Sequence, residues 1–595
     1  MMGKRKIIRK AVTATALLAG AYVYLNKAGE IEPIGSDKFK ESVVNFGKQT
    51  AFRKLDQTLT NGLSAVEKLL ALPENTGKET AQYFYEGTEE FLKSAAKGAK
   101  WCLGSASASL VPDDWQTHPY FLGGYMVAEN GFTNRVEQLI DDMRIRCIAL
   151  SDNSDRGVHL FGTIDCIGFS NKDIRVVRSM VAAKAAKEGI KLGSVNMFST
   201  HCHSCIDTQG LWTKTEDGGK ILSNLGKSLR GKEVEQGTDL HFLEVLYERA
   251  ADALWNAVLD MTPGKLTFAQ KDIGSGYVDN RNRPSATALP TMLNRFLFTP
   301  TDKKKAPTMI VNIGAHPDVA GLACNDGSSN GREISGDYVY YLGETLAEYG
   351  YNCMFFNGAI AGIYMARGLS NDGMPMEKRY EQSVRYGREL AKIAIGMTKT
   401  KEEIEADTAL SEPEVVAKEK ELCGDAYTLW YENWEPVKER KLNPKLNVRI
   451  REMTVRVTNP LIRVAGKLKM ANYDFYRNGR DSYLVTTEIG YMEWDDVKIA
   501  MVPCELVTDL YKGGKSLTAE GSCRGYDFGY PCLCDIFGDD LICFGLANDA
   551  VGYIVPDNDY SMRLLDGHYH ETLSLGDQTG STLIKTFLAL KNDLK

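Results

Sequence analysis

The chain has 595 residues, of which 43% are hydrophobic and 25% are charged, as in an ordinary globular protein with a sizeable buried core. Its net charge of −7 is negative, whereas nucleic-acid binding relies on positive charge that neutralises phosphates, so we expect no nucleic-acid partner. The 13 cysteines are scattered without two paired C-x-x-C motifs, which indicates neither a disulfide framework nor a structural zinc knuckle.

The amino terminus has the pattern of an export signal. Basic residues at positions 4–10 precede an uncharged, mainly apolar stretch from Ala11 to Leu25. That stretch contains a small-residue cleavage site, but it is short for a spanning helix, which needs about 20 apolar residues. We therefore expect residues 1–30 to be a signal peptide or a membrane anchor. This predicts an exported or membrane-anchored, extracytoplasmic protein with a membrane surface as a candidate partner, although unpaired cysteines argue against a strongly oxidising destination.

Residues 31–100 have the composition and spacing of a helical extension. Apolar residues recur at helical intervals, for example Phe39, Val43 and Phe46, and no residue of this region suggests chemistry. After Trp101 the sequence becomes rich in turns. We therefore place a catalytic domain at residues 101–595.

The first part of that domain alternates strand-like and helical patterns. Strand-like runs cover 146–150 and 158–165, a helical pattern follows over 171–188, and a further apolar run covers 195–199. Strands separated by a helix of this length predict an α/β fold with a mixed, partly parallel sheet. Asp165, at the end of its strand, is a candidate carboxylate partner for a histidine, and capping of the next helix or turn is the alternative.

The run at 195–199 leads directly into Thr200-His201-Cys202-His203. If the segment stays extended, side chains two residues apart point the same way, so His201 and His203 would face one cavity. One histidine could then bind a metal while the other meets a substrate. The alternative is a loop with two solvated histidines.

Two other apolar runs also end in side chains that can bind a metal. The run at 307–313 leads to His316, and the run at 497–502 leads to Glu505. Nitrogen and oxygen ligands of this kind suit zinc. The residues alone therefore suggest a zinc site at strand ends made by His201, His316 and Glu505, with ordinary core or loop roles as the alternative.

Six motifs occur in the order seen in the neutral (non-lysosomal, neutral/alkaline) ceramidases, and the resemblance covers roughly residues 101–580. Each motif is weak alone, whereas six in order are fairly specific. They are Phe121-Leu122-Gly123-Gly124-Tyr125, Ile164-Asp165-Cys166-Ile167-Gly168, Ser199-Thr200-His201-Cys202-His203-Ser204, Ala315-His316-Pro317, Val502-Pro503-Cys504-Glu505 and Asn548-Asp549-Ala550-Val551-Gly552-Tyr553.

The resemblance implies a Zn²⁺-dependent amidase that cleaves the amide of a ceramide-like N-acyl lipid. It implies that the zinc ligands are His201, His316, Glu505 and Tyr553. His203 matches a histidine beside the reacting amide. Arg283 matches the arginine of the family's N-R-S-P stretch, with Arg281 as the competing match. Tyr569 resembles a tyrosine that binds the substrate carbonyl, except that His570 separates it from Glu571.

The sequence departs from the family at two places. The segment that carries the family's nucleophilic serine falls on residues 361–365, where Tyr364 stands in place of serine. The chain also ends soon after Glu571, so we expect no carboxy-terminal β-sandwich. Without the serine, we expect water activated by zinc to attack the amide. The competing functions are a non-catalytic lipid-binding envelope protein and a zinc hydrolase of another amide or ester.

Overall fold

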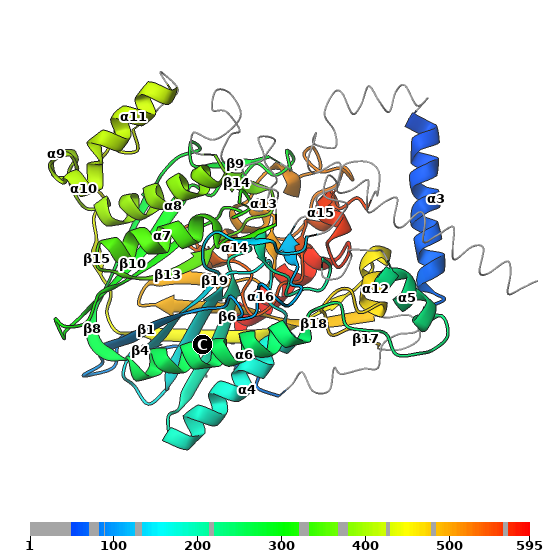
Figure 1. Cartoon of the computed structure of the whole chain (residues 1–595), viewed down its shortest axis with the longest axis horizontal. Coiled ribbons are helices and arrows are strands. Elements are labelled where there is room, and N and C mark those ends of the chain that lie inside the picture. Colours follow the sequence, from blue (N-terminus) through cyan, green and yellow to red (C-terminus); the bar gives the residue numbers. More distant parts are fainter. Residues whose placement is uncertain are drawn as a thin grey trace, which may run out of the picture.

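A computed structural model describes residues 49–70, 82–88, 90–124, 134–212, 219–281, 283–320, 332–366, 379–423, 429–477, 483–562 and 569–594 (Figure 1). The predicted signal or anchor lies outside these residues. One helix of the predicted extension is described, α3 (Gln49–Glu67), and Lys467 forms a buried ion pair with its last residue, Glu67. The division into an extension and a catalytic domain stays a prediction. No described helix combines the length and apolar character that crossing a membrane requires.

The main element of the fold is a large mixed sheet. Its order is β13 (Asn352–Asn357), β11 (Thr308–Ile313), β10 (Met292–Pro300), β8 (Thr262–Asp272), β1 (Trp101–Ser109), β4 (Arg144–Ser151), β5 (Val158–Ile164) and β6 (Leu192–Ser199), with β15 (Arg440–Lys441) beside β8. The central strands pair antiparallel, whereas β5 with β6 and β11 with β13 pair parallel. This confirms the predicted α/β fold with a mixed, partly parallel sheet.

A second sheet packs on the first. It consists of β16 (Leu446–Arg456), β18 (Tyr483–Trp494), β19 (Val497–Met501) and β21 (Ile542–Phe544), with β17 (Tyr476–Arg477) beside β18. Aromatic side chains from both sheets fill the space between them, and the rings of Phe356 and Phe544 stack with centroids 4.1 Å apart. Stacked rings of this kind contribute large apolar contact areas, so the interface is the centre of the core.

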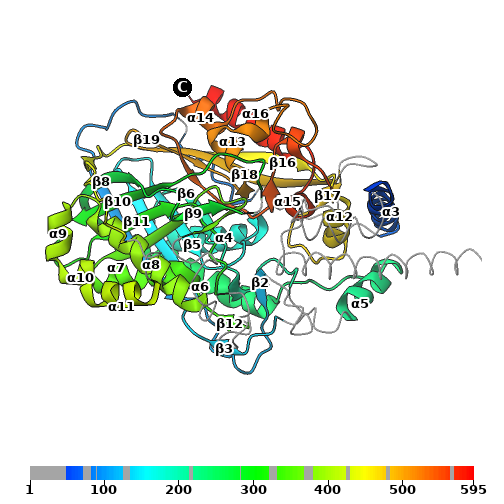
Figure 2. The same ribbon diagram turned by 90° about the horizontal axis from the view of Figure 1, so that it is seen from above.

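Helices cover the outer faces of both sheets (Figure 2). α4 (Asn171–Glu188), α6 (Leu240–Leu259), α7 (Asp337–Glu348) and α8 (Arg379–Gly396) cover the large sheet, and α13 (Thr508–Lys512), α14 (Leu533–Phe537) and α16 (Thr579–Asp593) cover the second. The predicted helix at 171–188 is confirmed, and it ends at Gly189, whose left-handed backbone (φ 67°) forms its C-cap. The side chain of Asp239 accepts from the Phe242 N–H and so begins α6.

The remaining elements are short. The helices are α5 (Gly219–Ser228), α9 (Lys401–Ala406), α10 (Thr408–Ser411), α11 (Pro413–Cys423), α12 (Pro460–Lys467) and α15 (Tyr569–Thr572), with 3₁₀ turns at Lys515–Leu517 and Asp557–Asp559. The strands are β2 (Leu122–Gly124), β3 (Gln138–Leu139), β7 (Ser204–Ile206), β9 (Val278–Asn280), β12 (Glu333–Ile334), β14 (Ile363–Met365), β20 (Glu505–Leu506) and β22 (Tyr553–Ile554). The eleven cysteines that the structure describes are free thiols.

Asn357, the last residue of β13, joins the ends of β6 and β11. Its side-chain amide donates to the carbonyls of Thr200 (2.8 Å) and Ala315 (3.0 Å), and its side-chain oxygen accepts from the Ala315 N–H (3.1 Å) and the Gly358 N–H (2.9 Å). Asn357 is fully buried. Since Thr200 precedes His201 and Ala315 precedes His316, this one side chain fixes the relative position of the two histidine segments.

We predict that Asn357→Ala destabilises the protein by about 2–5 kcal/mol, because buried backbone groups of Thr200 and Ala315 lose a hydrogen-bond partner. Urea unfolding monitored by circular dichroism measures the change. Asn443→Ala is the matched control, since Asn443 is exposed and hydrogen-bonds Asp495 at the surface; we expect a change within about 0.5 kcal/mol there. Equal stability of Asn357→Ala and the wild type would contradict the role of Asn357.

Candidate metal centre

His201 and His316 both leave the sheet with their ring orientation fixed by a backbone carbonyl. His201 Nδ1 lies 2.7 Å from the Ile167 carbonyl oxygen, and His316 Nδ1 lies 2.7 Å from that of Ile363. A carbonyl only accepts, so each Nδ1 carries a proton, and Nε2 is the nitrogen through which either ring would bind a metal. His201 also has a left-handed backbone (φ 67°), which is uncommon outside glycine and often marks a functional site.

The proposed contact of Asp165 with a histidine is wrong. Its carboxylate instead binds the Arg146 guanidinium at 2.8 and 2.9 Å and accepts from the Arg144 N–H. The carbonyl of Ile167, two residues farther on, orients His201 in its place. Like carboxylates, backbone carbonyls can accept from the second ring nitrogen of a metal-binding histidine and fix its orientation.

Glu505 lies between the two histidines. Its Oε2 is 3.2 Å from His201 Nε2 and 3.1 Å from His316 Nε2. β20 and β22 pair in parallel with Glu505 opposite Tyr553, so the register brings the predicted acidic ligand and the predicted tyrosine ligand side by side. Three of the four predicted ligands therefore converge through contacts of 3.1 and 3.2 Å, and the fourth is the strand neighbour of Glu505.

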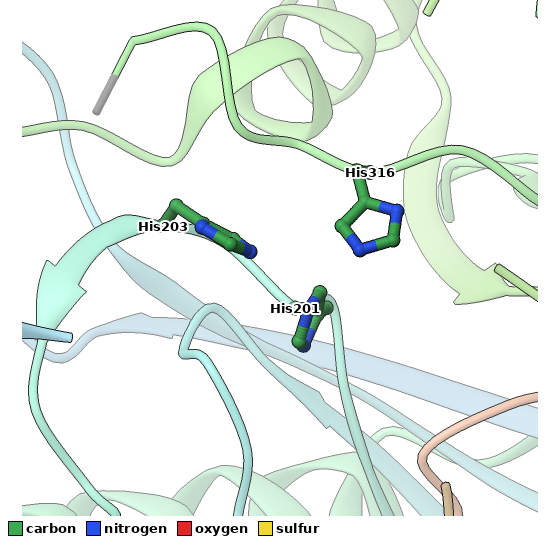
Figure 3. A group of neighbouring side chains, drawn as sticks. All are labelled: His201, His203 and His316. Carbon is green, nitrogen blue, oxygen red and sulfur yellow. The ribbon is translucent and has the colours of Figure 1, made fainter. Parts of the chain in front are cut away.

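His203 lies beside the other two histidines (Figure 3). His201, His203 and His316 are all buried, and each offers a ring nitrogen within 4.8 Å of the others, so this group could hold a metal ion. The backbone N–H of His203 donates to the Pro317 carbonyl, which ties it to the His316 segment. Gly124 packs on its ring, since a Cβ at that glycine would lie 2.7 Å from His203 Cγ.

The charges of the site favour an ionised glutamate between histidines. Burial alone raises the pKa of Glu505, but His201 and His316 outweigh burial and hold that pKa well below its ordinary value. For His203, burial and then the neighbouring His201 and His316 lower the pKa well below its ordinary value. His203 is therefore neutral at physiological pH, as either a ligand or a proton acceptor must be.

Three tyrosines surround this group. The ring of Tyr364 stacks on His316 with centroids 4.6 Å apart and planes at 14°. The hydroxyls of Tyr553 and Tyr569 hydrogen-bond at 2.5 Å. Burial, and then Tyr569 and Asp318, raise the pKa of Tyr364 well above its ordinary value, so its hydroxyl stays protonated. The resemblance put Tyr364 only at the position of the family's serine. Its stacking on a candidate ligand was not predicted.

Arg283 is anchored by two carboxylates. Its Nη2 lies 2.7 Å from Asp559 Oδ2 and 3.2 Å from Glu571 Oε1, and its Nη1 lies 3.3 Å from Glu571 Oε2. Its Nε has no hydrogen-bond partner among the described residues. Arg281, the competing match, is exposed, lies over the ring of Tyr364 and donates to the Met365 carbonyl. The predicted role of Arg283 at the reacting carbonyl thus rests on its Nε, because its other nitrogens bind protein carboxylates.

Sequence reasoning missed the residues that hold the ligands in place. In the sequence, Asn357 only precedes the small residues Gly358 and Ala359, which indicate a turn, and Ile167 is only part of a motif. His570 was noted as an intervening residue, yet it is buried and contacts both Arg283 and the ring of Tyr553. A buried strand that ends in asparagine was the one available signal for Asn357.

No protein-family model and no curated protein matches the chain. Among solved structures, the fold is similar to the crystal structure of neutral ceramidase from Pseudomonas aeruginosa, with a TM-score of 0.52 and 11% identity over 83% of this chain and 75% of that one. A ceramidase complexed with C2 matches with a TM-score of 0.52 and 11% identity over 83% and 76%. The resemblance to neutral ceramidases is confirmed at the level of the fold.

We predict that His201→Ala and His316→Ala each abolish retention of zinc, because losing one of four ligands opens the site. Metal content after gel filtration, measured by mass spectrometry, is the readout. His241→Ala, which changes an exposed histidine paired with Asp114, should keep wild-type zinc. Stoichiometric zinc in both ligand variants would reject the assignment.

Proposed function

We propose that this protein is a zinc-dependent hydrolase that cleaves the amide of a ceramide-like N-acyl lipid. The observation that carries the proposal is the convergence of His201 Nε2 and His316 Nε2 on Glu505 Oε2, with Tyr553 in register beside Glu505. The neutral ceramidase fold of the chain supports the same substrate class.

The residues present fit zinc. Two imidazole nitrogens, a carboxylate and a phenol oxygen form a nitrogen and oxygen donor set of the kind zinc accepts, and both imidazoles are already oriented by Nδ1 hydrogen bonds. When bound, zinc would supply Lewis acidity, which polarises carbonyls and lowers the pKa of water from about 15.7 to about 7. His201, His316, Glu505 and Tyr553 would hold it.

The other side chains supply proton transfer and substrate binding. His203 is neutral and buried, so a ring nitrogen can accept a proton from the attacking water and return it to the leaving amine nitrogen. The Tyr569 hydroxyl stays protonated, since burial and then Glu505 raise its pKa well above the ordinary value, and it can donate to the amide oxygen. Arg283 Nε is a second candidate donor for that oxygen.

Water is the proposed nucleophile because the chain has Tyr364 where the family has serine. A buried phenol that stays protonated is a poor nucleophile at neutral pH. Its ring stacks on His316. Tyr364 therefore supports the orientation of a ligand and takes no part in bond formation.

The substrate is tested with zinc-loaded protein. Fatty-acid release is measured from ceramides of several chain lengths and from soluble N-acyl amino compounds, and we expect turnover of the ceramides to be preferred. Turnover of only the soluble compounds would indicate a zinc hydrolase of another amide or ester. Ceramide binding without any turnover would indicate a non-catalytic lipid-binding protein.

We also propose that the protein is exported or anchored outside the cytoplasm, because basic residues precede an apolar stretch at 11–25. A membrane surface next to the site would concentrate an apolar substrate. Cell fractionation and amino-terminal sequencing test this; a wholly cytosolic protein with Met1 intact would reject it.

We predict that His203→Ala lowers kcat by about 10²- to 10⁴-fold and keeps zinc, because the proton acceptor is lost while the proposed ligands stay. Tyr364→Phe is the control: it preserves the ring on His316 and should lose less than about tenfold, well below the loss of an acid/base group. Initial rates and zinc content are measured together. Loss of zinc in His203→Ala would make His203 a ligand, and an inactive Tyr364→Phe would reject water as the nucleophile.

A further inference from the structure

His570 is a buried polar side chain with no role in the proposed reaction so far. It lies in α15 between Tyr569 and Glu571 and is 2% exposed. Its ring centroid lies 4.4 Å from that of Tyr553 and 5.0 Å from that of Tyr569. The imidazole therefore adjoins one predicted metal ligand and the predicted carbonyl-binding tyrosine.

The contacts of Arg283 determine which nitrogen of His570 carries the proton. Arg283 Nη1 lies 3.5 Å from His570 Nδ1, and a guanidinium can only donate. His570 Nδ1 therefore accepts, and in the neutral ring the proton lies on Nε2.

The Nε2–H of His570 has no hydrogen-bond partner among the described residues. Buried donors are nearly always satisfied in folded proteins, and those without a protein partner are often completed by a ligand. Nδ1 faces Arg283, and the two ring nitrogens point apart, so Nε2 points away from the charged cluster of Arg283, Asp559 and Glu571. The donor is thus held in one tautomer on the side of the ring opposite that cluster.

We propose that His570 Nε2–H is a substrate-binding donor that holds an acceptor oxygen of the N-acyl head group next to Tyr569. The inference rests on the proposed function and deepens it. A substrate carbonyl or hydroxyl oxygen would accept from this fixed N–H, whereas a protonated amine, which can only donate, would not bind there. His570 stands where the sequence departs from the family, so this contact would distinguish the chain from the ceramidases it resembles.

Two variants separate binding from packing. His570→Phe keeps a ring of similar size without the N–H, and His570→Gln keeps a side-chain N–H donor at similar reach. With zinc-loaded protein and a short-chain ceramide, we expect His570→Phe to lose about 10- to 10²-fold in kcat/KM and His570→Gln to lose much less, as when a hydrogen bond to the bound substrate is lost and its acceptor is left unpaired. Zinc content and melting temperature should stay at wild-type values in both, since the ring contacts are kept in one and the donor in the other.

A second readout does not require turnover. The protein has eight histidines, so ¹⁵N labelling of histidine and subtraction of the His570→Phe spectrum identifies the ring nitrogens of His570. We expect a protonated Nε2 and an unprotonated Nδ1 at neutral pH, and a downfield shift of the Nε2 proton when laurate is added as an oxygen acceptor.

The outcomes are distinct. If His570→Phe has the same turnover as the wild type, the proposal that His570 donates to the substrate is overturned, and the proposed hydrolase activity stands. If the wild type shows no turnover but its His570 Nε2 proton still shifts with laurate, the proposed amidase activity is rejected and the proposed donor role of His570 is kept. A proton on Nδ1, or no shift with laurate, also overturns the donor.

Discussion

The first constraint on the site is that two strands from different parts of the large sheet must end at the same place. β6 is at one end of the strand order and β11 is next to the other end, yet β13 lies against β4, β5 and β6 because the sheet curves. Asn357 completes this approach, since its amide bonds to backbone groups on both sides. An asparagine suits this position because it both donates and accepts. Loss of either function would leave a buried backbone group unpaired.

Buried charge is the second constraint, and the fold meets it by pairing. Glu505 is flanked by two histidines, and Arg283 by Asp559 and Glu571. Farther out, Glu488 of β18 binds Arg178 and Arg175 of α4 and so links the two sheets through a helix. A buried ion is tolerated only when its partners compensate for lost hydration, so each carboxylate fixes its neighbours in position. Glu505 differs from the carboxylates paired with arginine because its partners are imidazoles, which can themselves bind a metal ion, whereas a guanidinium can only donate.

Much of the fold and several residues of the candidate site could be predicted from local signals. Apolar runs that end in His201, His316 and Glu505 are visible in the sequence, and the helix at 171–188 has helical periodicity and a glycine directly after it. The groups that orient the histidines could not be predicted in this way. The Ile167 carbonyl and the Asn357 amide act through hydrogen bonds between residues far apart in the sequence, and residue type does not indicate which carbonyl a histidine will bind. Asp165 looked suitable by chemistry but was already paired with Arg146.

Two expected departures from the ceramidase pattern both contact residues of the candidate site. The ring of Tyr364 stacks on His316, and His570, which separates Tyr569 from Glu571, contacts the ring of Tyr553 and Arg283. His201 and His316 follow the ends of β6 and β11 in the large sheet, where a substitution would disturb the sheet, whereas Tyr364 and His570 lie in the short elements β14 and α15. Short elements accept substitutions with less disturbance of the core. A site of this kind can keep its ligand geometry while changing how the nucleophile is supplied and how the head group is bound.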